Sequence, residues 1–154
     1  MTSMTSPSPS LPVDGGKPAP PRTALDQPPL VDPSVLERLR TELEDSSGYT
    51  RVFVANYVRC LPGRVERLRV SLTTGDWAGS FDAVLSLKTT SQMVGAELLA
   101  SLALELEAEL RSAASADPTV ALPRYAARFL APINRCSTRT IRSLASRGRG
   151  LWEP

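Results

Sequence analysis

Histidine is absent from this chain of 154 residues, and cysteine and aromatic residues are scarce. Without histidine, the sequence offers no imidazole for metal binding, general base catalysis or phosphoryl acceptance. The two cysteines, Cys60 and Cys136, lie far apart in the sequence, and neither has a second metal-ligating residue such as Cys or His nearby. We therefore expect both to be buried apolar side chains, and we expect no metal and no cofactor. Aromatic residues make up 5% and hydrophobic residues 42%, which favours a helical core of Leu, Val and Ala.

Long apolar runs and catalytic motifs are also missing. No run approaches the roughly 18 apolar residues of a membrane span, and the N-terminus lacks a charged segment followed by an apolar one. No nucleophile has a neighbouring base, and no glycine-rich loop suits a phosphate. We therefore expect a cytoplasmic protein that has no membrane segment and is not an enzyme.

Proline is abundant but unevenly placed. Eight of the 14 prolines fall within residues 1–30, among Ser, Thr and Gly, with almost nothing to bury. This composition predicts a disordered leader over 1–30. Structure should begin at Asp32-Pro33, because an N-cap followed by proline at the first helical position is a common helix start. We expect this short helix to end at Gly48.

Apolar residues at spacings of three and four predict four longer helices after this short one. They cover residues 50–73, 76–96, 96–113 and 117–145, and Asp76 and Asp117 are their expected caps. Pro62 should kink the first of these helices near Cys60 or divide it. The short turn at Gly75 implies antiparallel neighbours, so we predict an all-α, antiparallel four-helix bundle over 31–145 and a flexible basic tail over 146–154.

The helix expected over 76–96 carries an aliphatic residue on its polar flank. With about 100° per residue and Val84 at the centre of the apolar stripe, Leu85 falls well to the side. Its neighbours on that flank are Asp82, Lys88, Thr89 and Gln92.

The segment from Ala83 to Ala96 resembles the core motif of histidine phosphotransfer (HPt) domains, which is roughly Ala-x-His-x-Leu-Lys-Gly followed by an apolar-Gly-Ala. The pairs Leu87-Lys88 and Gly95-Ala96 match that motif. Two residues depart from it, because Leu85 stands at the position of the phosphorylated histidine and Thr89 at that of the usual glycine. The run from Leu68 to Asp76 is similar to the family's Leu-x-x-Ala-Leu-x-x-Gly-Asp, with Ser71 in place of Ala. Leu106-Glu107 and the Asp-Pro that opens the first helix match the family as well.

The resemblance implies an HPt-type bundle that has lost its phosphoacceptor. Leu85 has no lone pair, and the hydroxyls nearby have no evident base, so phosphotransfer is not expected. HPt domains dock on a mainly apolar patch of a response-regulator receiver domain, around an acidic aspartate pocket. The resemblance therefore implies a protein that binds a receiver domain or a histidine kinase as a scaffold or decoy. The expected contacts are Asp82, Leu85, Lys88, Thr89 and Gln92, with Lys88 facing acidic or phosphate groups.

The C-terminal part of the chain is cationic and suggests a different function. Residues 119–154 contain seven Arg and one Glu, and 7 − 1 gives a net charge of +6. Five of these arginines would line one face of a continuous helix: Arg124, Arg128, Arg135, Arg139 and Arg142. The alternative is therefore a helical protein that binds nucleic acid through phosphates, although no interleaved aromatic residues favour it. In either case we expect a monomer.

Overall fold

The protein folds as an all-α bundle in the computed structural model, which describes residues 27–42 and 48–152, with side chains described through Arg147. The helices are α2 (Pro33–Glu42), α3 (Tyr49–Thr73), α4 (Trp77–Met93), α5 (Glu97–Ser112) and α6 (Pro118–Trp152). The predicted all-α, antiparallel four-helix bundle with an extra N-terminal helix is confirmed. None of the described helices is long and apolar enough to cross a membrane.

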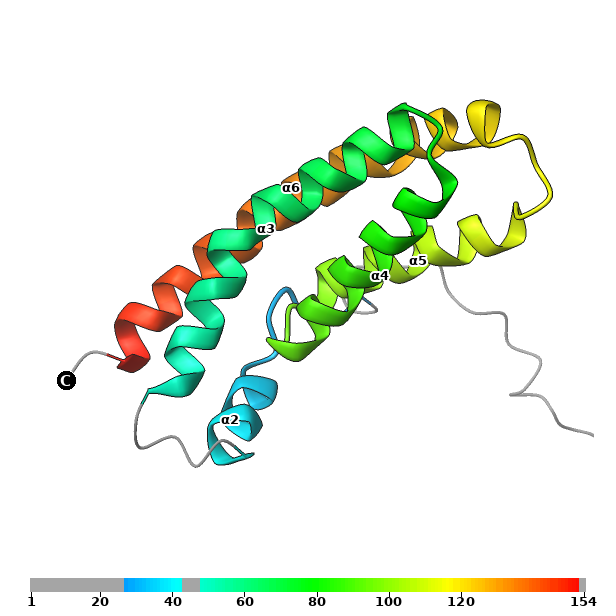
Figure 1. Cartoon of the computed structure of the whole chain (residues 1–154). Coiled ribbons are helices and arrows are strands. Elements are labelled where there is room, and N and C mark those ends of the chain that lie inside the picture. Colours follow the sequence, from blue (N-terminus) through cyan, green and yellow to red (C-terminus); the bar gives the residue numbers. More distant parts are fainter. Residues whose placement is uncertain (1–26, 43–47, 153–154) are drawn as a thin grey trace, which may run out of the picture.

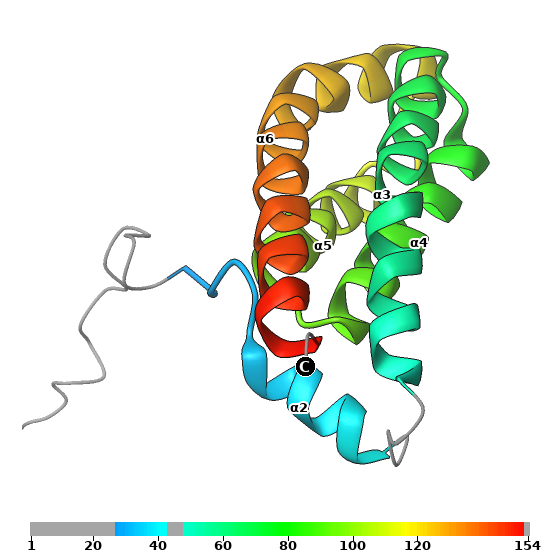
Figure 2. The ribbon, with the colours of Figure 1, turned by 90° about the vertical axis from the view of Figure 1, so that its left-hand side faces the viewer.

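The four long helices pack so that each contacts two of the others (Figure 1). α3 lies beside α6, and α4 lies beside α5, while α3 also packs on α4 and α5 on α6. α2 lies across one end of the bundle, near the start of α3 (Figure 2). The fully buried core is almost entirely aliphatic, and its largest members are Leu61, Leu68, Leu72, Leu87, Leu99, Leu106, Leu110, Leu122, Ile133 and Leu144.

Three aspartates begin helices as the sequence predicts. The Asp76 carboxylate accepts a hydrogen bond from the Gly79 amide at 3.0 Å. Asp32 accepts from the Ser34 amide at 3.0 Å, and Asp117 accepts from the Thr119 amide at 3.0 Å. Each carboxylate thereby satisfies an amide that has no partner inside its own helix, which fixes where the helix starts.

Two expected features of the long helices are corrected. α3 is a single helix with Pro62 inside it, so of the two alternatives the division into two pieces is wrong, while the bend near Cys60 stays a prediction. Leu61, Val65 and Leu68 lie on one face of α3, on both sides of Pro62, and all three are buried. Their burial offsets the roughly 3 kcal/mol that an internal proline costs.

α6 continues past Ala145 to Trp152, so the expected helix end is wrong as well. Its internal prolines, Pro123 and Pro132, do not interrupt it. Of the flexible tail predicted over 146–154, the last two residues lie outside the described residues. Of the predicted leader, residues 1–26 lie outside them, whereas Leu30 already packs against the core and Val31 is buried.

Candidate functional site

The solvent-facing side of α4 is a ridge formed by Asp82, Leu85, Thr89 and Gln92, which we call the α4 ridge. Asp82, Thr89 and Gln92 are exposed, and Leu85 is half-buried. The opposite side of the helix is buried through Ser80, Ala83, Val84, Leu87 and Ser91. The expectation that Leu85 is at least partly exposed is therefore confirmed, and an aliphatic side chain stands where the HPt motif places its histidine.

On the α5 side of the ridge, Lys88 takes part in a charged triad. Its Nζ donates to Glu107 Oε1 at 2.7 Å, and the Arg111 guanidinium donates to Glu107 Oε2 at 2.7 Å. The Glu107 side chain is only 6% exposed, and hydrogen bonds from Lys88 and then Arg111 lower the pKa of its carboxyl. The Lys88 ammonium is thus directed at Glu107, and its expected contact with an acidic partner stays a prediction.

On the α3 side of the ridge, a groove separates α3 from α4. Arg64 Nε donates to Ser86 Oγ at 3.4 Å across it. We call this the arginine groove; it has a volume of about 360 Å³, and its lining consists of Arg59, Cys60, Gly63, Arg64, Arg67 and Ser86. Cys60 is exposed, so the expectation of a buried side chain holds for Cys136 and is wrong for Cys60. Sequence reasoning missed these arginines, although the spacing of four from Cys60 to Arg64 and three to Arg67 places them along one side of α3.

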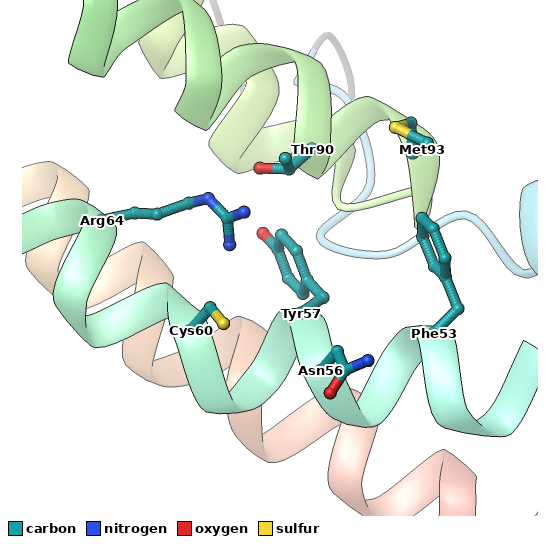
Figure 3. A pocket seen from close by; sticks show the side chains of 7 residues that line it. All are labelled: Phe53, Asn56, Tyr57, Cys60, Arg64, Thr90 and Met93. Carbon is teal, nitrogen blue, oxygen red and sulfur yellow. The ribbon is translucent and has the colours of Figure 1, made fainter.

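A second hollow continues the groove toward α2. Figure 3 shows Arg64 extending from α3 toward α4, with its guanidinium beside the Tyr57 ring. This hollow has a volume of about 270 Å³, and its lining residues are Phe53, Asn56, Tyr57, Cys60, Arg64, Thr90 and Met93. It adds an apolar extension to a groove that is otherwise cationic.

The hydroxyl groups of Ser86, Thr90 and Ser91 on α4 are engaged in structural hydrogen bonds. Tyr57 pairs with Ser91 at 2.7 Å, and burial raises the pKa of the Tyr57 phenol to about 12, so this phenol is neutral at physiological pH. Thr90 donates to the Ser86 carbonyl at 2.8 Å, and Ser86 Oγ accepts from Arg64. These partners are an arginine, a hydroxyl and a carbonyl, and none of them is a base that would activate an alcohol.

The five arginines predicted along the last helix do share one face. All of them are exposed, and α6 is continuous through their positions. Arg128 pairs with Glu109 at 3.3 Å and lies 5.0 Å from the centre of the Phe129 ring. Within residues 27–42 and 48–152, no group of three or more Cys, Asp and Glu side chains could hold a metal ion.

The fold is similar to the crystal structure of histidine-containing phosphotransfer protein B (HptB) from Pseudomonas aeruginosa PAO1. The TM-score is 0.65 at 25% sequence identity, and the match covers 79% of this chain and 96% of that one. No family model matches the sequence, and neither does any curated protein. The comparison agrees with the motif in residues 83–96, and the chain has an HPt-like helical bundle fold.

Proposed function

We propose that this protein is a non-catalytic, HPt-like member of a two-component phosphorelay. It binds a response-regulator receiver domain, or a histidine kinase, through the α4 ridge and does not carry phosphate itself. As a bound but unreactive partner it acts as a scaffold or as a decoy that occupies the receiver surface.

The observation that carries this proposal is the position of Leu85. It lies on the outward side of α4, between exposed polar residues, in a bundle similar to that of a phosphotransfer protein. A half-exposed leucine there adds apolar contact area to a docking surface but provides no nucleophile. The HPt-like fold and the absence of histidine therefore support binding without transfer.

The test is a pull-down of receiver domains from lysate of the source cell, with wild type and Leu85→Asp as baits at moderate salt. We expect wild type to retain a specific receiver and Leu85→Asp to lose it, because a carboxylate would be buried without a partner and would repel the acidic receiver pocket. Leu104→Asp is the matched control, since Leu104 is an exposed leucine on α5. Equal retention by all three baits, or neither a receiver nor a histidine kinase in any of them, would contradict the proposal.

A second candidate function is nucleic-acid binding by α6. It is favoured by the five exposed arginines on one face of a continuous helix. The test replaces Arg135, Arg139 and Arg142 by Gln and measures retention of duplex DNA and of RNA against salt. If this function is right, the triple variant loses retention and keeps receiver binding, and wild-type affinity falls steeply as salt rises. Retention that is unchanged by the triple substitution excludes it.

A further inference from the structure

The arginine groove lies directly beside the α4 ridge. Ser86, which follows Leu85 in the sequence, forms one wall, and Arg59, Arg64 and Arg67 of α3 contribute the opposite side. Arg64 is half-buried, whereas Arg59 and Arg67 are exposed. A ligand that covered Leu85 would therefore meet three guanidinium groups on its α3 side.

The charges in this groove differ from the charge of Lys88. Lys88 is bound to the buried carboxylate of Glu107. Arg59 instead bonds to the Asn56 amide oxygen, and Arg64 bonds to the Ser86 hydroxyl, so both have neutral acceptors. These bonds leave the positive charge of the groove in place, which makes α3 the cationic flank of the docking surface.

Two acidic residues lie on α3 and α4 and reduce the positive electrostatic potential of the groove. Glu66 of α3 forms an ion pair with Arg69 at 2.5 Å, and so its charge is balanced outside the groove. Asp82 is exposed on the α4 ridge, one helical turn before Ser86. Three arginines against one nearby carboxylate leave the groove with an excess of positive charge.

We propose that the arginine groove binds the phosphoryl group carried by a phosphorylated receiver domain, so that this chain prefers the phosphorylated form of its partner. Guanidinium groups bind phosphate oxygens through paired, charge-assisted hydrogen bonds, and the Ser86 hydroxyl adds a further donor. The volume of about 360 Å³ is ample for a phosphoryl group. This inference rests on the proposed function, because it names what the docked receiver presents.

The phosphoryl group stays on the partner in this complex. Leu85 has no lone pair with which to attack phosphorus, so no bond forms or breaks, and the acyl phosphate of the receiver remains intact. The protein would thus recognise a phosphorylated receiver without discharging it. Such binding distinguishes a reader of the phosphorylated state from a decoy that binds both forms equally.

The first arm of the test uses inorganic phosphate and the full-length chain. Phosphate is titrated against chloride at matched ionic strength while backbone amide signals are followed by NMR. We expect shifts concentrated at the groove, with affinity reduced about tenfold or more in Arg64→Gln/Arg67→Gln, because two charge-assisted bonds are lost. Arg38→Gln/Arg51→Gln is the matched control, since it removes two exposed charges outside the groove. Chemical-shift changes of equal size at the groove and at Arg38 and Arg51 would overturn the proposed phosphate site.

The second arm compares phosphorylated and unphosphorylated forms of the receiver retained in the pull-down. We expect wild type to bind the phosphorylated form about tenfold more tightly, and Arg64→Gln/Arg67→Gln to lose this preference while still binding both forms. Leu85→Asp should weaken both forms together. Equal binding of the two forms, with Leu85 still required, overturns this inference and leaves the proposed function standing. Phosphate binding in the first arm without binding of either receiver form overturns this inference, and the absence of a bound histidine kinase as well overturns the proposed function.

Discussion

Glu107 is a buried charged residue that links α4 and α5 beside the α4 ridge. Its carboxylate accepts from Lys88 of α4 at 2.7 Å and from Arg111 of its own helix at 2.7 Å. The Arg111 guanidinium also lies 5.1 Å from the centre of the Phe81 ring on α4. One carboxylate therefore holds Lys88 in place and helps to set the position of α4 against α5.

We predict that Glu107→Gln lowers the free energy of unfolding at pH 7 by about 1–3 kcal/mol, because Lys88 and Arg111 lose a charged acceptor. The folded-state pKa of Glu107 lies below its ordinary value of 4.5, so its stabilising contribution is complete above that value. The contribution is lost as pH falls through the lowered pKa. Urea unfolding should therefore show a difference between wild type and variant that shrinks from pH 7 to pH 3.

The control for this prediction is Asp82→Asn, which removes an exposed carboxylate from α4, the helix that carries Lys88. We expect it to change the free energy of unfolding by less than about 0.5 kcal/mol at pH 7. A Glu107→Gln difference as large at pH 3 as at pH 7 would show that packing, and not the charge, is what the residue contributes.

At the scale of elements, the position of α2 depends on Gly95 in the turn between α4 and α5. Its φ is +77°, and a Cβ there would lie 2.7 Å from the Asp32 carbonyl oxygen and 2.9 Å from Val35 Cβ. The Gly95 carbonyl also accepts from the Asp32 amide at 2.8 Å. The turn thus touches the start of α2 so closely that only glycine fits.

We predict that Gly95→Ala is more destabilising than Gly48→Ala. Gly48 has nearly the same φ, +78°, but nothing lies within 4 Å of where its Cβ would be. Both variants should lose about 1–2 kcal/mol to the left-handed backbone, and Gly95→Ala a further 1–3 kcal/mol or so to the clash with α2. Urea unfolding measures the two losses, and equal values would mean that α2 moves aside without cost.

The elements that the sequence predicts well are those with local signals. Asp32, Asp76 and Asp117 begin helices through bonds to amides two or three residues away, and neighbouring residues alone determine such caps. The effect of Pro62 on α3 and the end of α6 were harder to predict from the sequence. Whether a helix continues past such a point depends on burial of the residues on both sides of it. Local propensity therefore favoured breaks that tertiary packing does not allow.

At the scale of the whole molecule, the α4 ridge was predictable and its two flanks were not. Lys88 and Glu107 are 19 residues apart, and Arg64 and Ser86 are 22 apart. Contacts of this kind depend on how far one helix is shifted along its neighbour, which periodicity does not specify. The charge distribution follows from the same packing, because α3 and α6 lie side by side and carry most of the arginines (Figure 1).

The whole bundle can be tested as a phosphotransfer scaffold by restoring the missing imidazole. Wild type has no histidine, and Leu85 is already half-exposed on the outward side of α4. We predict that Leu85→His accepts labelled phosphate from a phosphorylated receiver, where wild type shows none above background, because the new imidazole provides the nucleophilic nitrogen. Thr89→Gly in the same chain should raise the labelled fraction further, since residue 89 lies one turn away and the removal of its side chain leaves more room for the receiver.

The matched control is Leu85→Gln, which introduces a polar side chain of similar size but no comparable nucleophile. Because both substitutions are at a half-exposed position, both variants should keep the helical circular dichroism of wild type. Label on the histidine variants alone would mean that the bundle still presents residue 85 to a receiver in reactive geometry. Folded histidine variants that still bind the receiver yet stay unlabelled would mean that the chain has lost this geometry along with the histidine.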